Sequence, residues 1–286
     1  MSSPVRDYIE LTKPRLSLLV WMTMLGGYFM APHGTTLFSL AATLIGTMLV
    51  VGGANALNQV HEREVDGLMR RTRGRPLPSG RLWARSASAF GIAFTAAGIA
   101  LLATVVNPVA AVLAGVGFVL YVFVYTPLKR RSSLCTLIGA VPGAIPPLIG
   151  WAAATGSLDG TAWTLFGILF LWQLPHFYAI ARLFREDYRR GGMAMIGIED
   201  DDGPRAYRRM VIYSAVLLPM SFLLARTGVV GVFYLVGSAL LGIGFLAASI
   251  NAIRRDDRVA DRTVFLYSLA YLPILLTVML LDRHLF

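Results

Sequence analysis

The chain has 286 residues, is 56% hydrophobic and only 15% charged, and has a mean hydropathy of +0.63, which is too apolar for a soluble domain of this length. Its net charge of +10 does not indicate nucleic-acid binding, because the basic residues gather in alternate loops between apolar runs. The single cysteine, Cys135, excludes an internal disulfide framework. The composition therefore predicts a protein embedded in a lipid bilayer.

Runs without charged residues mark the expected membrane spans, because crossing the hydrocarbon core takes about 20 mostly apolar residues. The longest runs each hold two spans separated by a turn signal, such as Ala31-Pro32-His33-Gly34-Thr35 or Asn107-Pro108. The first residues lack the basic-then-apolar pattern of a cleavable signal, so we expect the first span to be retained. Nine spans are predicted within 16–61 (two), 86–128 (two), 132–158, 160–181, 210–253 (two) and 263–281.

The basic residues predict how these spans are oriented. The segments 1–15, 62–85, 129–131, 182–209 and 254–262 together hold 24 of the 26 Lys and Arg residues. These segments all lie on one side if nine spans separate them. Since cytoplasmic loops carry the excess of Lys and Arg, we expect a cytoplasmic N-terminus and an external C-terminus.

Three oxygen-bearing side chains stand at four-residue spacing where the second span ends. Asn58, Glu62 and Asp66 therefore share one face of a helix over roughly 12 Å. Mg²⁺ prefers oxygen ligands and usually takes one or two carboxylates together with phosphate oxygens and water. The alternative is a solvated helix end whose acids pair with Arg63 and Arg70, and the spacing alone does not decide between the two.

Four arginines follow these acids directly, at positions 70, 71, 73 and 75, before Gly and Pro residues stop the helix. Arginine binds phosphate oxygens bidentately, so acids that hold a metal beside arginines that hold phosphate predict a diphosphate cradle. Some of these arginines also have a simpler explanation as topology anchors against anionic lipid.

Two further cytoplasmic segments carry candidate site residues. Asp187 and Tyr188 lie among arginines after the sixth span and could form a second wall of the metal site, whereas the acidic run 199–203 is typical of a solvated loop. Lys129 could reach a phosphate as a point charge. For Arg130 and Arg131, a role as positive-inside anchors is equally plausible.

The fifth and sixth spans carry signals of a cavity wall. Three glycines and three prolines within 139–150 predict a broken or kinked helix whose freed backbone groups lie against protein or a cavity. In the sixth span, Trp172, His176 and Tyr178 stand close together. A histidine inside a membrane either makes an interhelical hydrogen bond or contacts a substrate, here a flat aromatic one.

In combination, these motifs resemble those of the UbiA-type intramembrane prenyltransferases, and among them the branch that farnesylates protohaem IX, the haem O synthases. The resemblance spans most of the chain. It departs from the superfamily at the second acidic motif, which usually has two aspartates four residues apart, because Leu183 stands four residues before Asp187. Its motifs are 58–66 running into 69–76, 125–130, 143–151, and 172–178 with 187–188.

The resemblance implies an all-α bundle of nine helices around a central cavity, formed by a single domain over residues 1–286. It implies transfer of the farnesyl group of farnesyl diphosphate to a vinyl group of haem B, with addition of water, to give haem O. It also implies a multi-pass protein of the bacterial inner membrane, with Mg²⁺ as cofactor and a haem A synthase or terminal oxidase assembly as downstream partner. The implied catalytic residues and metal ligands are Asn58, Glu62, Asp66 and Asp187; the diphosphate-binding residues are Arg70, Arg71, Arg75, Lys129, Arg130 and Tyr188; and the haem contacts are His176, Trp172 and Tyr178.

Two other functions stay open at this point. A prenyltransferase with a different aromatic acceptor, such as a quinone precursor, would share the donor motifs, because the sequence encodes the donor chemistry more clearly than the shape of the acceptor. A transporter would also have kinked helices, but it predicts charged groups near the middle of the bilayer. The acids of this chain instead cluster at one rim.

Overall fold

The computed structural model describes residues 4–32, 36–196, 198 and 203–285, and every regular element within these ranges is a helix. The all-α prediction is therefore confirmed. Residues 33–35 of the first expected turn and residues 199–202 of the acidic run lie outside the described residues.

Eight helical segments in the described ranges are long and apolar enough to cross a membrane, so the chain is a multi-pass membrane protein. The first expected span corresponds to α2 (Pro14–Met30), which has 17 residues and a length of about 25 Å. It is shorter than these eight segments, and the count of nine spans stays a prediction. The eight are α3 (Leu37–Leu68), α4 (Ala84–Leu101) with η1 (Leu102–Val106), α5 (Pro108–Val119) with η2 (Leu120–Tyr125) and α6 (Thr126–Leu128), α7 (Cys135–Thr155), α8 (Gly160–Leu183), α10 (Gly203–Ala225), α11 (Val232–Arg255) and α12 (Arg258–Leu285).

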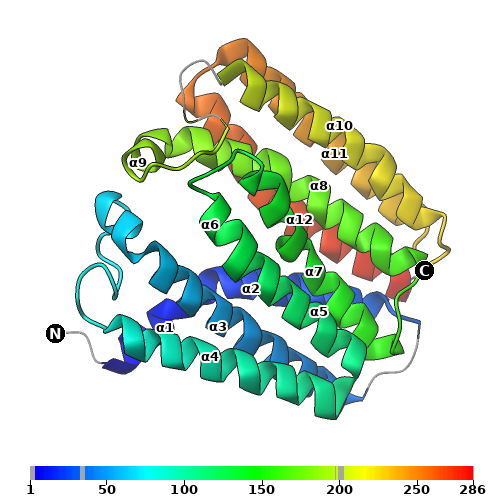
Figure 1. The fold of residues 1–286 in the computed structure, drawn as a ribbon. Helices are drawn as coiled ribbons and strands as arrows, with labels where there is room; N and C mark the ends of the chain where they lie inside the picture. Colours follow the sequence, from blue (N-terminus) through cyan, green and yellow to red (C-terminus); the bar gives the residue numbers. More distant parts are fainter. Residues whose placement is uncertain (1–3, 33–35, 197, 199–202, 286) are drawn as a thin grey trace. The chain divides into compact units, whose positions relative to one another are not determined.

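The contacts group the helices into two compact units. The first unit comprises residues 1–157 and 187–193, and in it α3 packs along α4 while α2 and α5 pack along α7 (Figure 1). It also contains the short helix α1 (Pro4–Leu11) and most of α9 (Arg185–Arg190). In the second unit, α10 packs between α8 and α11, and α12 packs against both α8 and α11.

Two glycines allow α2 and α7 to pack backbone against backbone. A Cβ atom at Gly150 of α7 would collide with the carbonyl oxygen of Met24, and one at Gly27 of α2 would collide with the carbonyl oxygen of Pro147. Helices inside a membrane gain little from hydrophobic burial against each other, so close contacts between small residues supply much of their attraction. The glycines therefore fix where α2 lies along α7.

Helix α7 is uninterrupted from Cys135 to Thr155, although Pro142, Pro146 and Pro147 lie inside it. Of the two predicted alternatives, a broken or a kinked helix, the break is not observed, and the kink stays a prediction. Pro146 and Pro147 are buried, and α2 packs along this stretch. Tertiary packing of this kind compensates for the backbone donors that proline removes.

Candidate functional site

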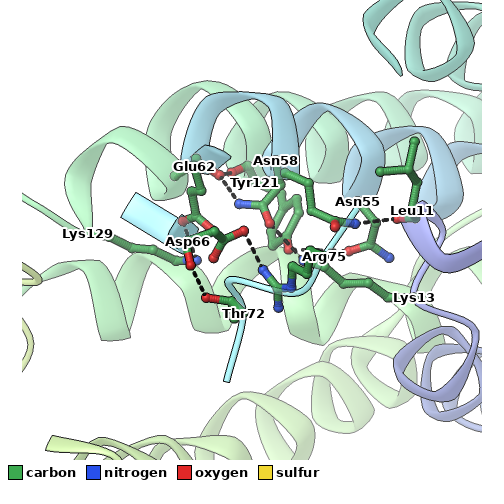
Figure 2. Close-up of polar contacts among 12 residues, drawn as sticks. Leu11, Lys13, Asn55, Asn58, Glu62, Asp66, Thr72, Arg75, Tyr121 and Lys129 are labelled. Atoms are coloured by element: carbon green, nitrogen blue, oxygen red, sulfur yellow. Dashed lines mark hydrogen bonds and ion pairs between the residues drawn. The ribbon is translucent and has the colours of Figure 1, made fainter. Parts of the chain in front are cut away.

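The three residues spaced along α3 lie on one buried polar face, as their spacing predicts (Figure 2). Asn58, Glu62 and Asp66 are 0%, 8% and 1% exposed, so none is a solvated helix end. Buried carboxylates are costly unless they are paired or hydrogen bonded. The partners of these groups therefore decide what the site can do.

Each of the three residues has its own cationic partner. Lys129 Nζ lies 2.7 Å from Glu62 Oε1, and Arg75 Nη1 lies 2.6 Å from Asp66 Oδ2. Lys13 Nζ donates to Asn58 Oδ1 at 2.8 Å. We call these six residues the ion cluster; they are Lys13, Asn58, Glu62, Asp66, Arg75 and Lys129 (Figure 2).

Lys13 reaches the cluster from a strained backbone bend between α1 and α2. Its φ of 50° lies in the left-handed region, which costs a residue with a side chain about 1 kcal/mol or more. Two side chains of α3 hold this bend: Asn55 Nδ2 donates to the carbonyl of Thr12 at 3.1 Å, and Gln59 Nε2 donates to the carbonyl of Leu11 at 2.8 Å. The polar face of α3 thus maintains the strain that aims Lys13 at Asn58.

The cluster holds three cations and two carboxylates, which leaves one excess positive charge at the level of formal charges. Burial lowers the pKa of Lys13 to about 7, and the nearby Arg75 guanidinium lowers it too. Burial alone would also lower the pKa of Lys129, but the adjacent Glu62 carboxylate raises it well above the usual range. A partly buried excess of positive charge favours an anionic ligand.

A π-helical turn, η2, brings two tyrosines to the cluster. Tyr121 and Tyr125 stack with ring centroids 5.6 Å apart, and Lys129 Nζ lies 4.5 Å from the Tyr125 ring centroid. Thr126 follows this turn, accepts a hydrogen bond from Asn58 Nδ2 at 3.0 Å and donates to the Tyr121 carbonyl at 2.8 Å. Such widened turns recur at functional sites because they re-aim neighbouring side chains.

The second charged loop contacts the first one. Asp187 Oδ1 accepts a hydrogen bond from the backbone N–H of Arg70 at 3.2 Å, and the Arg71 guanidinium lies 4.5 Å above the Tyr188 ring centroid. The structure therefore brings these four predicted residues together just beyond the end of α3. Among the described residues, Asp187 binds the backbone of the loop and forms no ion pair.

A cavity of about 480 Å³ opens beside the ion cluster. Glu62 and Thr126 line it, and so do His61, Arg130 and Arg131. Its volume lies within the range of about 300–1,000 Å³ that is typical of small-molecule sites. The site thus combines a buried, charged wall with space for a ligand.

Comparison with known proteins agrees with this combination of motifs and fold. The model of the UbiA prenyltransferase family matches residues 19–272. The chain belongs to this family. A protoheme IX farnesyltransferase of Solibacter usitatus is 46% identical over 289 residues, covering 98% of this chain and 99% of the relative. One of Myxococcus xanthus is 43% identical over 279 residues, covering 97% of this chain and 94% of the relative.

Several solved structures share the fold at low sequence identity. A structure described for digeranylgeranylglyceryl phosphate synthase has a TM-score of 0.83 at 17% identity and covers 99% of both chains. A UbiA homologue of Archaeoglobus fulgidus, bound to DMAPP and Mg²⁺, has a TM-score of 0.70 at 16% identity and covers 96% of this chain and 99% of that one. The family membership excludes the transporter alternative.

The ion cluster fits a metal ligand set of the kind that Mg²⁺ uses with phosphates. The Asp66 carboxylate is buried, and its Oδ1 atom has no hydrogen-bond partner among the described residues. Across the described ranges, no group of three or more His, Cys, Asp or Glu residues is placed to hold a metal by itself. An amide oxygen and two carboxylates that share a metal with phosphate oxygens remain compatible with this finding. The metal-ligand role of Asp187 stays a prediction.

The predicted haem contacts lie in the second unit, and all three have partners there. His176 Nδ1 lies 2.7 Å from Ser268 Oγ, and Trp172 Nε1 donates to the Ser268 carbonyl at 2.9 Å. The rings of Trp172 and His176 stack at 5.6 Å. Tyr178 accepts a hydrogen bond from Arg209 at 3.3 Å. The interhelical alternative for His176 is therefore observed, and contact with haem stays a prediction.

Several residues of the site were not predicted from the sequence, and Lys13 is the most important of them. In the sequence it reads as a positive-inside anchor before the first span. One available signal is that Lys13 directly precedes Pro14 at a helix start. A second is that Asn55, three residues before Asn58, and Gln59, directly after it, add polar side chains to the motif. Thr72, Tyr125 and Thr126 stand within the motifs 69–76 and 125–130, but no site role was predicted for them, and Tyr121 lies outside these motifs.

Proposed function

We propose that this chain converts haem B to haem O by transferring the farnesyl group of farnesyl diphosphate to a haem vinyl group. The observation that carries the proposal is the match, over 98% of the chain, to a relative named protoheme IX farnesyltransferase. The ion cluster supports the donor half of the reaction, because a partly buried excess of positive charge suits a diphosphate.

The ion cluster would bind the donor through its cations. Lys129 and Arg75 are each within 2.7 Å of a carboxylate that a metal would ligate, so both ammonium and guanidinium groups would turn toward phosphate oxygens when the donor arrives. Lys13 stands in the same position relative to Asn58. Among the other sequence predictions, Arg70, Arg71, Arg130 and Tyr188 remain proposed diphosphate contacts.

Asn58, Glu62 and Asp66 are the residues that would hold Mg²⁺, with Asp187 as a further candidate. When bound, Mg²⁺ neutralises charge on a departing diphosphate. The A. fulgidus homologue binds DMAPP together with Mg²⁺, which supports the same pairing of ligands here.

The proposed reaction breaks the C1–O bond of the donor, and its electron pair leaves with the diphosphate. The vinyl group supplies the electron pair for the new carbon–carbon bond to C1. Water then adds to the adjacent carbon and releases a proton, so haem B, farnesyl diphosphate and water give haem O and diphosphate. The side chains contribute charge stabilisation and orientation, and no nucleophilic residue is required.

The remaining sequence predictions complete the proposal. We infer one enzyme domain that includes both compact units and lies in the bacterial inner membrane, with nine spans around a central cavity, a cytoplasmic N-terminus, cytoplasmic site loops and an external C-terminus. The Lys and Arg distribution supports this orientation. Trp172, His176 and Tyr178 would contact haem, and a haem A synthase or terminal oxidase assembly would receive the product.

The proposal is tested by incubating the purified protein with haem B, farnesyl diphosphate and Mg²⁺ and measuring haem O by mass spectrometry. Haem O is expected only when all three are present. Farnesylation of 4-hydroxybenzoate without any haem O would overturn the acceptor and favour a quinone precursor instead.

A further inference from the structure

The cavity beside the ion cluster has two different walls. Glu62, which belongs to the ion cluster, and Thr126, which accepts a hydrogen bond from Asn58 of the cluster, form its polar wall. Val65, Pro127 and Met193 supply apolar surface on the same cavity. A ligand that fills this space therefore needs an apolar body as well as polar groups.

The three consecutive cations at the end of α6 separate into two sets. Lys129 turns inward to the Glu62 carboxylate at 2.7 Å. Arg130 and Arg131 are exposed side chains that line the cavity, and neither forms an ion pair with a described carboxylate. Two guanidinium groups without an acidic partner at the edge of a cavity provide up to ten N–H donors for an anionic ligand.

The location of the cavity suits the acceptor of a two-substrate reaction. Reacting atoms must approach to about 3–3.5 Å, so the acceptor has to bind directly beside the donor. Because Glu62 of the ion cluster and Thr126, the partner of Asn58, both line the cavity, a ligand in it lies against the residues that would hold the diphosphate. The donor needs the cations of the ion cluster, which leaves Arg130 and Arg131 for the other substrate.

We propose that this cavity holds the carboxylate-bearing edge of the porphyrin acceptor, with Arg130 and Arg131 binding its propionate groups. The apolar wall at Val65, Pro127 and Met193 then faces the ring. This inference rests on the proposed function and reassigns Arg130 from the diphosphate to the acceptor. It places a haem contact in the first unit.

The experiment compares three proteins: the unmodified chain, Arg130→Ala/Arg131→Ala, and the control Arg63→Ala/Arg85→Ala. The control also removes two exposed arginines of the first unit, but neither of them lines the cavity. Each protein is titrated with ferric haem B, with its dimethyl ester, and with a non-reactive thio-analogue of farnesyl diphosphate in the presence of Mg²⁺. The ester removes the propionate charges and leaves the porphyrin ring unchanged.

Loss of the two arginines is expected to weaken haem B binding about 10- to 100-fold, because hydrogen bonds between charged groups are the strong ones. In the unmodified chain the ester should bind as weakly as haem B binds to the double variant. In the double variant, esterification should make little further difference. The donor analogue should bind equally well to all three proteins.

Several results would overturn the inference. Weaker donor binding with unchanged haem binding would return both arginines to the diphosphate. Unchanged binding of both substrates, with reduced association with vesicles that contain anionic lipid, would make them membrane anchors only. If the alanine variant does not fold, Arg130→Gln/Arg131→Gln answers the same question. Failure of the unmodified chain to bind haem B at all would instead refute the proposed function.

Discussion

Replacing Lys13 by Met is the most informative change in the ion cluster. Methionine has a similar length and fills the same space, but it removes the ammonium group that donates to Asn58 at 2.8 Å. The cluster then holds two cations and two carboxylates, so its excess positive charge disappears. The change therefore separates the electrostatic role of Lys13 from its packing.

The expected effect on the donor follows from one lost charged contact. A hydrogen bond to a charged group contributes about 1.5–3 kcal/mol, and each 1.4 kcal/mol corresponds to a tenfold change in affinity. Lys13→Met should weaken binding of the thio-analogue of farnesyl diphosphate with Mg²⁺ by about 10- to 100-fold. Isothermal titration calorimetry of the detergent-solubilised protein measures this directly, with haem B binding as an internal control that should not change.

The same change should leave the fold as stable as before or make it more stable. Burying an ammonium group costs free energy, as the lowered pKa of Lys13 indicates, and an apolar side chain of equal length avoids that cost. Lys13→Arg keeps the charge and should retain part of the donor affinity. Unchanged donor affinity in Lys13→Met, or an equal loss of haem binding, would refute the assignment of Lys13 to the diphosphate.

Three further predictions concern the metal, the helix contact and the haem candidates. Asp66→Asn should reduce Mg²⁺-dependent turnover by about 100-fold or more, as expected when transition-state charge loses its stabilisation, and near-normal turnover would remove its ligand role. Gly150→Ala should destabilise the protein by about 1–3 kcal/mol or prevent folding, because its Cβ collides with a backbone carbonyl of α2, whereas Gly115→Ala meets no atom closer than 3.9 Å and should leave the Tm unchanged. His176→Ala should alter the absorption spectrum of bound haem, while Ser268→Ala should lower only the Tm; identical effects of the two variants would make His176 purely structural.

Much of the architecture could be predicted from local sequence. The charge-free runs placed the long helices, because apolar length is a property of consecutive residues. The four-residue spacing likewise placed Asn58, Glu62 and Asp66 on one face of α3, since helical periodicity is local. What a spacing rule cannot give is the partner of each residue.

Those partners come from segments distant in sequence. Lys13 lies 45 residues before Asn58, and Lys129 lies 67 residues after Glu62, so only the packed fold brings them into contact. The opposite directions of Lys129 and Arg130 also could not be foreseen, because both read as basic residues after a span. The prolines of α7 left a broken and a kinked helix open for the same reason, because the packing against α2 that keeps the helix continuous involves a segment distant in sequence.

The close crossing of α2 and α7 has a consequence for the donor site far from the crossing itself. Backbone contact at Gly27 and Gly150 leaves α2 no freedom to slide, and the bend that carries Lys13 is continuous with the first turn of α2. The entropy of immobilising this lysine is therefore lost when the protein folds and not when the substrate binds. Substitutions that loosen the crossing should weaken donor affinity even though they touch no ligand. Gly27 and Gly150 thereby help to hold the Lys13 ammonium group in place before the substrate binds.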